Sequence, residues 1–481
     1  MINQKLHIAI LASPGLGHLI PVLILGNRLA TDHGAKVTVL VNKTSSSVES
    51  QVLNNLASGP NMDILEIPPV NISHLIDADT KAVAKICIMV REALPFIRSA
   101  IAGMKDGHRP DILISDLFCT EAFSIATEFN MPKYVYVPTS AWHVALKMYS
   151  PVLDKQIEGQ YVDQTEPLKI PGCKSIRPED VVEPMVDRND QQYRELVRMG
   201  REFSTGDGIL INTWEDLEQV TLEAFRENES LREVIMSTVY PIGPLTRPGE
   251  PKGPNRENHE LMEWLDMQPC ESVLYVSFGS GGTLSAEQLI ELAWGLEISQ
   301  QRFIWVVRPP ARIADGSFFT SGSGSSDGTP DYLPEGFLGR TKNLGLIVSQ
   351  WAPQVEILSH PSVGGFLTHC GWSSTLESLK NGVPMIVWPL YAEQRLNATM
   401  LAEELGVAVR PKVLPTKKVV DRKEIEEMVR TIMASEKGKL IRERVKQVKI
   451  SALDAIQEGG SSVNAMRDFL KDVTVRLNMR S

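Results

Sequence analysis

Short apolar runs alternate with amphipathic stretches of helical length along the chain. "HIAILA" (7–12) is a continuous apolar run that breaks at "SPGLGH" (13–18). "LIPVLILGNRLATDHG" (19–34) then has helical length and ends at a glycine, and "AKVTVLVN" (35–42) has the β-branched residues of a strand. A strand, a helix and a strand at this spacing predict a βαβ unit, and such units build parallel sheets.

The alternation continues through the first half and restarts in the second. Further candidate strands in the first half are "DILISD" (111–116), "KYVYVP" (133–138) and "GILIN" (208–212). "PIGPLTRPGEPKGPN" (241–255) is rich in proline and glycine without periodicity, which is typical of a linker. After it come "SVLYVSFGS" (272–280), "RFIWVVR" (302–308), "LGLIVSQW" (344–351), "VGGFLTH" (363–369) and "PMIVWPL" (384–390), each followed by a loop or a helix-like stretch.

This pattern predicts an α/β protein of two Rossmann-like domains that face one another across a cleft. The length of 481 residues also exceeds what one core usually covers. We expect a first domain at 1–243, a linker at 244–258, a second domain at 259–455, and a C-terminal helix at 456–481 that packs back on the first domain. The Gly/Ser-rich segment 314–331 is predicted to be a surface loop without chemistry.

Charge and cysteine content narrow the classes of partner and compartment. The formal net charge of −10 argues against nucleic acid as a partner, although backbone N–H groups can still bind a local anion. The five widely spaced cysteines, without a C-x-x-C motif, fit a reducing compartment. The N-terminus lacks the features of a signal peptide, and no stretch has the roughly 20 apolar residues of a membrane span. We therefore expect a cytoplasmic, monomeric protein without a transmembrane anchor.

Polar and aromatic residues gather just after the predicted strands of segment 351–394. In open α/β sheets, ligands bind beyond the carboxyl ends of the strands. Ser373 and Ser374 would open a helix, where hydroxyls and free N–H groups can hold an anion, while either serine alone could simply cap the helix. Glu377 follows one turn later, and its carboxylate suits the vicinal hydroxyls of a ribose better than a phosphate. A nucleotide diphosphate fits this arrangement.

A second group of candidates lies in the first half. His18 follows the glycine-rich turn after the first strand, and Asp116 ends a later strand of the same predicted sheet. Neutral imidazole suits the removal of a proton from a hydroxyl near neutral pH, and a carboxylate behind it would fix the tautomer. A lone histidine after a glycine turn is more often polar surface, so the functional interpretation depends on the aspartate.

The 44-residue segment 351–394, together with "SPGLGHLIP" (13–21) and "VSFGSGGTLS" (276–285), resembles plant family 1 UDP-glycosyltransferases, which have the GT-B fold. Nearly the whole chain is similar to the phenylpropanoid and hydroquinone glucosyltransferases of that family. The resemblance implies an inverting glucosyltransferase that moves glucose from UDP-glucose to a hydroxyl of a small aromatic acceptor, without a metal or cofactor. Ser373 departs from the family, which commonly has asparagine there, and we expect weaker donor binding at most.

The resemblance also implies roles for individual residues. Catalysis falls to His18 as the base and Asp116 behind it. For the nucleoside, the resemblance assigns Trp351 to uracil, Ala352 and Gln354 to positions beside it, and Glu377 to the ribose. The residues assigned to the diphosphate are Ser280, His369, Ser373 and Ser374. Trp372, Glu393 and Gln394 are assigned to the glucose, and the glutamine favours UDP-glucose as the donor. Ser13 and Ser140 match positions that touch phosphate or sugar. The acceptor pocket is expected around Phe118, Trp142, Met148, Met185 and Met199, whose apolar side chains suit aromatic alcohols.

Other patterns leave two alternatives open. "GLGHLI" (15–20) begins like a dinucleotide fingerprint, so an NAD(P)-dependent oxidoreductase with two Rossmann halves is one, but Ile20 replaces the third glycine. A non-catalytic nucleotide-sugar-binding protein is the other, and the presence of His18 with Asp116 argues against it. "DAD" (77–79) resembles the metal-binding pair of other glycosyltransferases, but lies far from the donor segment in sequence, and we expect no metal site there.

Overall fold

The computed structural model describes residues 5–43, 52–53, 56, 59, 61–104, 109–249, 256–310, 332–349 and 351–480. The predicted surface loop at 314–331 and residues 250–255 of the predicted linker lie outside the described residues. The chain divides into two compact units. The first comprises Met1–Pro178, Pro184–Thr246 and Asp454–Ser481, and the second comprises Glu179–Glu183 and Arg247–Leu453.

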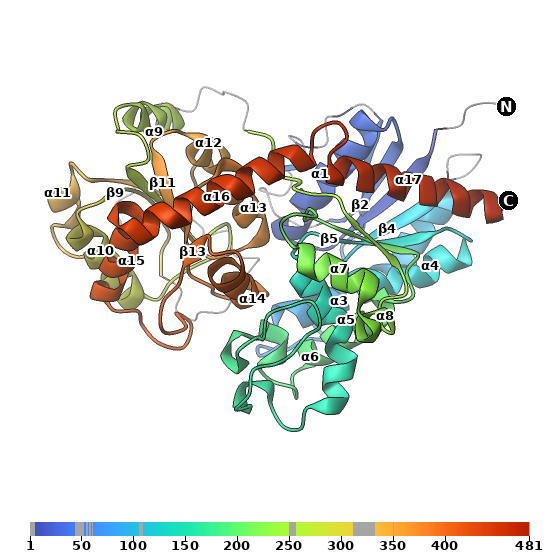
Figure 1. The fold of residues 1–481 in the computed structure, drawn as a ribbon. Coiled ribbons are helices and arrows are strands. Elements are labelled where there is room, and N and C mark those ends of the chain that lie inside the picture. Colours follow the sequence, from blue (N-terminus) through green and yellow to red (C-terminus); the bar gives the residue numbers. More distant parts are fainter. Residues whose placement is uncertain are drawn as a thin grey trace. The chain divides into compact units, whose positions relative to one another are not determined.

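The first unit is built on a parallel sheet with the strand order β3-β2-β1-β4-β5-β6-β7 in its described part. Its strands and helices alternate along the chain, as the βαβ pattern predicts (Figure 1). Their bounds are β1 His7–Ala12, α1 Leu16–Asp32, β2 Lys36–Asn42, β3 Met62–Ile67, α3 Ala82–Gly103, β4 Ile112–Asp116, η1 Thr120–Ala122, α4 Phe123–Glu128, β5 Lys133–Val137, α5 Ala141–Gln156, η2 Tyr161–Asp163, η4 Glu183–Met185, α6 Gln191–Phe203, β6 Gly208–Ile211, α7 Gln219–Glu227, α8 Glu229–Arg232, β7 Thr238–Pro241 and α17 Ser461–Arg480.

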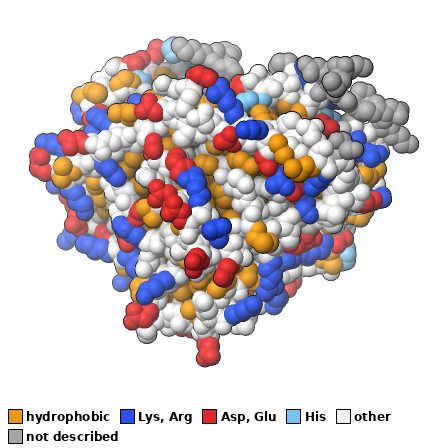
Figure 2. All heavy atoms as spheres, turned by 45° about the vertical axis from the view of Figure 1, so that its right-hand side comes forward, with side chains coloured by type: hydrophobic (Ala, Val, Ile, Leu, Met, Phe, Trp, Pro, Cys, Tyr) orange, Lys and Arg blue, Asp and Glu red, His pale blue; other side chains and the backbone are white. Residues whose placement is uncertain are grey.

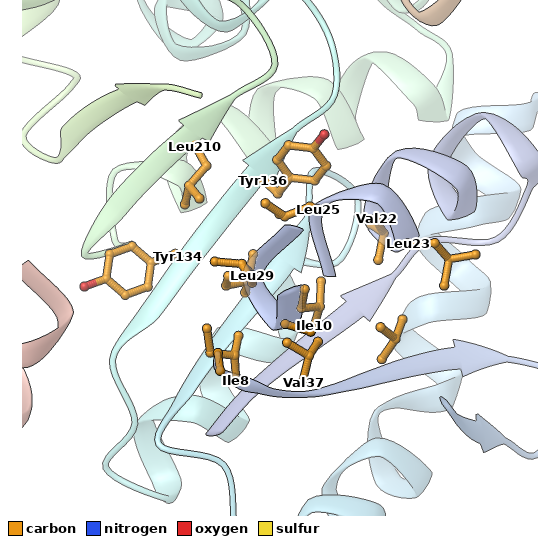
Figure 3. Close-up of a cluster of buried hydrophobic side chains, with 14 of the residues drawn as sticks. Ile8, Ile10, Val22, Leu23, Leu25, Leu29, Val37, Tyr134, Tyr136 and Leu210 are labelled. Carbon is orange, nitrogen blue, oxygen red and sulfur yellow. The ribbon is translucent and has the colours of Figure 1, made fainter. Parts of the chain in front are cut away.

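Strand β1 forms the centre of this unit because the five residues after His7 are apolar and can be buried on both faces of the sheet, while the buried His7 ring contacts the Thr38 hydroxyl. Ile8 and Ile10 belong to one core cluster with Val22, Leu25 and Leu29 of α1, and Figure 3 shows these side chains gathered between the helix and the strands. The same cluster takes Tyr134 and Tyr136 from β5 and Leu210 from β6 (Figure 3). The sequence therefore buries α1 against the sheet and fixes the loop between β1 and α1.

The second unit contains a parallel sheet with the order β10-β9-β8-β11-β12-β13 in its described part. Its core joins apolar residues of β8 and β9 to those of α10 and α15, among them Leu274, Trp305, Leu292 and Val429. The bounds are η3 Pro178–Asp180, α9 Arg256–Asp266, β8 Val273–Ser277, α10 Ala286–Ser299, β9 Arg302–Val307, α11 Phe337–Thr341, β10 Gly345–Ser349, α12 Gln354–Ser359, β11 Val363–Thr368, α13 Trp372–Asn381, β12 Met385–Val387, α14 Gln394–Thr399, η5 Met400–Glu404 (a π-helical turn), β13 Ala408–Val409, α15 Arg422–Ala434 and α16 Glu436–Ala455.

The strand order reverses once in each sheet. The reversal lies between β1 and β4 in the first unit and between β8 and β11 in the second. A crevice for ligands forms at such points, beyond the carboxyl ends of the two strands, because the following connections leave in opposite directions. The loops after β1 and β4, and those after β8 and β11, are therefore the places to examine for chemistry.

Two segments belong to a different unit from the residues that flank or precede them in sequence. Glu179–Glu183 interrupts the first unit but belongs to the second, and Asp454–Ser481 follows the second unit but belongs to the first. Asp180, with a fully buried side chain, lies in the second unit and pairs with Arg410 at 2.7 Å. Helix α17, red in Figure 1, packs on β7 of the first unit, and its Phe469 ring lies 4.9 Å from that of Tyr134. Leu245, inside the predicted linker, belongs to the first core, and α9 begins at Arg256. The hydrophobic periodicity within each segment does not indicate these long-range contacts.

Figure 2 shows the distribution of charged side chains on one face of the molecule. On the face drawn in Figure 2, acidic and basic side chains are interspersed, and neither sign covers a continuous area. Among the described residues, no helix is both long enough and apolar enough to cross a membrane.

Candidate active site

The first candidate pair lies where the first sheet reverses its strand order. His18 is in the first turn of α1, directly after β1, and Asp116 is the last residue of β4. Nδ1 of His18 is 3.2 Å from Oδ2 of Asp116. The carboxylate is fully buried, whereas the histidine side chain is 18% exposed. A histidine held by a buried carboxylate through Nδ1 can present Nε2 as a base.

Ser13 contacts the same carboxylate from the other side. Its hydroxyl donates a hydrogen bond to Oδ1 of Asp116. In a serine hydrolase the histidine lies between the serine and the carboxylate, so that it can take the serine's proton. Here Asp116 lies between Ser13 and His18, so the serine hydroxyl is committed to the carboxylate. The trio therefore holds a histidine base in position and does not form a nucleophilic serine.

An aromatic ring, that of Phe118, lies beside His18. The Phe118 ring lies 4.9 Å from the His18 ring in an edge-on arrangement. Lys147 of α5 is 1% exposed, and its Nζ is 5.2 Å from the Phe118 ring centroid and 4.0 Å from Sδ of Met199. Sequence reasoning did not single out Lys147, although a lysine inside the apolar helix "AWHVALKMYS" (141–150) was a visible signal. The ammonium group thus joins two of the five residues predicted for the acceptor pocket.

The other predicted residues of this unit are buried on neighbouring elements. Trp142 and Met148 lie on α5, and Met185 lies in η4, each with 2% exposure or less. Ser140 caps α5, and its side chain accepts a hydrogen bond from the His143 backbone N–H at 3.3 Å. Burial, together with the charges of Lys147 and His18, holds the pKa of His143 well below its usual range. The His143 ring is therefore neutral at the start of α5.

In the second unit, β11 runs into the uncapped start of α13. The N-cap residue is Gly371, which offers no side chain to the first-turn N–H groups of Trp372, Ser373 and Ser374. His369 lies just before this helix, and its ring packs against Gly279 in the loop after β8. Gly279 has a φ of +72°, and a Cβ there would lie 2.4 Å from Cε1 of His369. The sequence therefore keeps a glycine where the two loops meet at the strand reversal.

His369 is neutral and has hydrogen-bonding capacity to spare. Burial, reinforced by the charge of Arg308, lowers the pKa of His369 to about 4. Its Nδ1 atom is buried and has no hydrogen-bond partner within the part of the chain that the structure describes. Buried polar atoms are rarely left in this state, because each one costs about 1–3 kcal/mol. An uncapped helix start beside such an imidazole is a suitable site for an oxyanion.

Arg308 supplies the positive charge in this region. It follows β9, the neighbour of β8, and its guanidinium donates to the carbonyl oxygen of Ser280. Arg308, Gly279 and Ser277 line the same small pocket. The sequence signal for Arg308 was its position as the last residue of a predicted strand, as Ser280 and His369 are of theirs.

Five side chains on and beside α13 form one connected group. Gln354 donates through Nε2 to Ser374 Oγ at 3.0 Å and to Oε2 of Glu377 at 2.6 Å. Nε of Arg247 is 3.1 Å from the other oxygen of Glu377. The same guanidinium lies 5.6 Å from the ring centroid of Trp351, which is 47% exposed. Ala352, which follows this tryptophan, is buried. Arg247 was not predicted, because the proline-rich stretch around it carries no pattern.

The loop before α14 is held in place from two directions. Gln394 accepts hydrogen bonds at its Oε1 atom from the backbone N–H groups of Leu390 and Tyr391, at 2.9 and 3.1 Å. Ala392, whose φ is +54°, accepts a hydrogen bond from the backbone N–H of Glu183 and donates its own N–H to the Glu183 carboxylate. Glu183 belongs to the segment Glu179–Glu183 of the second unit. Since the loop occupies the amide oxygen of Gln394, its NH₂ group is the part suited to donate to a ligand. Glu393 is the N-cap residue of α14, and its Oε1 atom is 3.3 Å from Nδ2 of Asn397.

Asp77 is used locally in a turn. Its Oδ1 atom accepts from the Thr80 hydroxyl at 2.6 Å and from the Asp79 backbone N–H at 3.1 Å. These hydrogen bonds lower the pKa of Asp77. Among the described residues, no three His, Cys, Asp or Glu side chains are grouped so as to hold a metal ion.

Comparison with known proteins assigns the chain to a family. Residues 215–439 match the family described as "UDP-glucoronosyl and UDP-glucosyl transferase". Anthocyanidin 3-O-glucosyltransferase 5 of Manihot esculenta is 54% identical, over 97% of this chain and 95% of its own. Hydroquinone glucosyltransferase of Rauvolfia serpentina is 43% identical, over 96% and 97% respectively. A structure of Phytolacca americana UGT2 complexed with UDP-2fluoro-glucose and pterostilbene has a TM-score of 0.85 at 37% identity and covers 98% of this chain and 99% of that one.

Proposed function

Because the chain belongs to the UDP-glucuronosyl and UDP-glucosyl transferase family, we propose that it transfers glucose from UDP-glucose to a hydroxyl of a small aromatic acceptor, with inversion, to give a β-glucoside. The observation that carries this proposal is the His18–Asp116 pair, with its 3.2 Å contact at the strand reversal. The names of the relatives support glucose as the sugar and phenolic compounds, such as hydroquinone and anthocyanidins, as the acceptor class.

In the proposed step, Nε2 of His18 takes the proton of the acceptor hydroxyl as its oxygen attacks C1 of glucose. The C1–O bond to the β-phosphate breaks, and UDP leaves with the electron pair. Asp116 holds the imidazole through Nδ1 and stabilises the imidazolium that forms, while the Ser13 hydroxyl stabilises the carboxylate. Attack from the face opposite the leaving group converts the α-linkage of UDP-glucose into a β-glucoside. His18 then returns its proton to solvent.

The second unit is proposed to bind the donor. Trp351 is exposed enough to stack on uracil, and Glu377 has a carboxylate for the ribose hydroxyls. The uncapped start of α13, with the serines at 373 and 374 and the orphaned Nδ1 of His369, suits the diphosphate, as does the loop at Ser280. Trp372, Glu393 and the NH₂ group of Gln394 are assigned to glucose, and Ala352 to the nucleoside.

The first unit is proposed to bind the acceptor. Phe118, beside His18, offers an aromatic contact next to the base. Lys147 lies over the Phe118 ring, and Met199 contacts Lys147. Trp142, Met148 and Met185 are assigned to the pocket on the same grounds as in the sequence, since flexible apolar side chains accept flat aromatic rings. Ser140, at the start of α5, is assigned to the sugar.

We also propose that the reaction needs no metal ion, because Arg308 and the α13 terminus already offer positive potential to the diphosphate. The wide spacing of the five cysteines, without a C-x-x-C motif, supports a reducing compartment, and we propose a cytoplasmic monomer.

The experiment is a screen of phenols, phenylpropanoid alcohols and flavonoids with UDP-glucose, followed by NMR of the product. We expect UDP release together with a β-configured anomeric signal. His18→Ala serves as the matched control and should abolish most of the turnover. An α-configured product would contradict inversion, and hydrolysis of UDP-glucose without glycoside formation would contradict the acceptor class.

A further inference from the structure

One guanidinium connects the two side chains assigned to the nucleoside. Nε of Arg247 is 3.1 Å from Oε1 of Glu377, and Cζ of Arg247 is 5.6 Å from the centroid of the Trp351 ring. Glu377 is 1% exposed at its side chain and Arg247 is 23% exposed, so the ion pair is largely shielded from water. Such pairs are screened by solvent much less than surface pairs are.

The position of Glu377 creates an electrostatic difficulty for a donor with a charged diphosphate. Gln354 Nε2 contacts both Glu377 and Ser374, so the carboxylate and the hydroxyl assigned to phosphate share one amide nitrogen. A bare carboxylate this close to a diphosphate would repel it in a poorly solvated site. A positively charged group paired with the carboxylate, as Arg247 is, removes most of that repulsion.

The contacts with the described residues also leave acceptor positions on the Glu377 carboxylate. Glu377 receives one donor at each oxygen, Gln354 at Oε2 and Arg247 at Oε1. An ionised carboxylate has about four acceptor positions, so one remains at each oxygen for a vicinal hydroxyl. The guanidinium and the amide thus hold the carboxylate plane in one orientation without filling it.

We propose that Arg247 is a positioning residue of the donor site: it orients Glu377 for the ribose and cancels its charge, so that a nucleoside diphosphate can bind beside it. This inference rests on the proposed function, because it takes the nucleoside site to be at Trp351 and Glu377. Arg247 acts through these two side chains and through the field at the diphosphate.

The test compares uridine with UDP as probes, using calorimetry on the full-length protein. In Arg247→Met the side-chain stem remains while the charge is lost. We expect UDP affinity to fall by about tenfold or more, which corresponds to roughly 1.4 kcal/mol, and uridine affinity to fall by about threefold or less. Added salt should narrow the UDP loss. The double variant Arg247→Met with Glu377→Gln should bind UDP better than Arg247→Met alone, because the unpaired charge is gone.

Arg340→Met is the matched control. Arg340 also pairs with a glutamate, Glu297, at 2.6 Å, and its guanidinium lies 4.7 Å from the Trp294 ring centroid, but neither partner is assigned to the donor. Its affinities for uridine and UDP should equal those of the wild type. Arg247→Lys, which keeps the charge, should retain most of the UDP affinity and provides a second variant if Arg247→Met folds poorly.

The results of this test distinguish the proposed role of Arg247 from the proposed donor site itself. If Arg247→Met binds uridine more tightly than the wild type, Arg247 occupies the place of the base and the inference is overturned. Equal losses for uridine and UDP, or no loss for either, also overturn it, because the effect must grow with the diphosphate charge. If the wild type itself binds neither uridine nor UDP, the proposed donor site fails, irrespective of Arg247.

Discussion

At the scale of single residues, the contacts of His18 define what the first unit can catalyse. Asp116 lies between Ser13 and His18, so the imidazole does not activate Ser13, and this arrangement supports our proposal that it serves a substrate hydroxyl. A general base contributes roughly 10²–10⁴-fold, and it contributes most when the acceptor holds its proton tightly. This argument leads to a prediction about acceptor acidity.

His18→Ala should lose far more activity toward alcohols and ordinary phenols than toward nitrophenols or chlorinated phenols, which are already partly ionised near neutral pH. Asp116→Asn should give the same ordering in milder form. The measurement is kcat/KM over a series of phenols of graded acidity for the wild type and both variants. An identical loss on every phenol would rule out the base role.

His369 leads to a prediction about acid stability. Its pKa of about 4 in the folded protein lies below the ordinary value of 6.5, so between these limits the unfolded chain binds the proton more readily. The stabilisation is complete above about pH 6.5 and is lost as the pH falls toward 4, by up to about 3 kcal/mol.

His369→Gln should therefore weaken the acid dependence of the free energy of unfolding of the second unit. The measurement is chemical denaturation at pH 7 and pH 4.5, without ligand, for the wild type and the variant. If both lost the same stability between these values, His369 would not be a neutral buried base.

At the scale of elements, the two loops of the second sheet meet through a glycine and a histidine. Gly279→Ala adds a Cβ that would lie 2.4 Å from His369 Cε1, at a φ of +72°. We expect UDP affinity to fall by about tenfold or more, because the ring must leave its present position beside Gly279 and the proposed hydrogen bond to a charged group is lost. The positive φ should also cost about 1–2 kcal/mol of stability.

Gly406→Ala provides the control for this prediction. Gly406 has a φ of +63° in the same unit, but a Cβ there meets nothing within 4 Å. It should lose similar stability while keeping the UDP affinity of the wild type, measured by calorimetry. If the two variants bound UDP equally, contact between the loops would not matter for the donor site.

At the scale of the whole molecule, the fold is GT-B, with two parallel sheets whose strand order reverses at the candidate sites. Family membership decides between the functions that the sequence left open, in favour of glycosyl transfer over the oxidoreductase and the non-catalytic binder. The first unit is completed by the last helix of the chain, α17, which supplies Met466, Phe469 and Val473 to its core.

Phe469→Ala should destabilise the first unit by about 3–5 kcal/mol, because a fully buried ring in contact with Tyr134 and Tyr240 is removed. Val475→Ala, on the same helix but 44% exposed, should change stability by about 0.5 kcal/mol or less. Thermal unfolding of both variants checks this. Equal effects would mean that α17 is not part of that core.

The proposed metal independence can be tested on the whole enzyme. Turnover of UDP-glucose should persist in excess EDTA, since the proposed charge partners of the diphosphate are Arg308 and a helix terminus. Loss of activity in EDTA, restored by manganese but not by removal of the chelator alone, would contradict this proposal.

Apolar periodicity and strand-end chemistry were enough to predict the parallel sheets and the positions of His18, Asp116 and the segment from Trp351 to Gln394. These features are local, because burial on both faces requires continuous apolar runs, and parallel strands bring their carboxyl ends to one edge. The tertiary structure alone decided the partners: Arg247 on Glu377, Lys147 on Phe118, Ser13 on Asp116 and residues 179–183 in the second unit. Each of these contacts joins residues from different elements, so its formation depends on how folded elements pack, which no periodicity along the chain encodes.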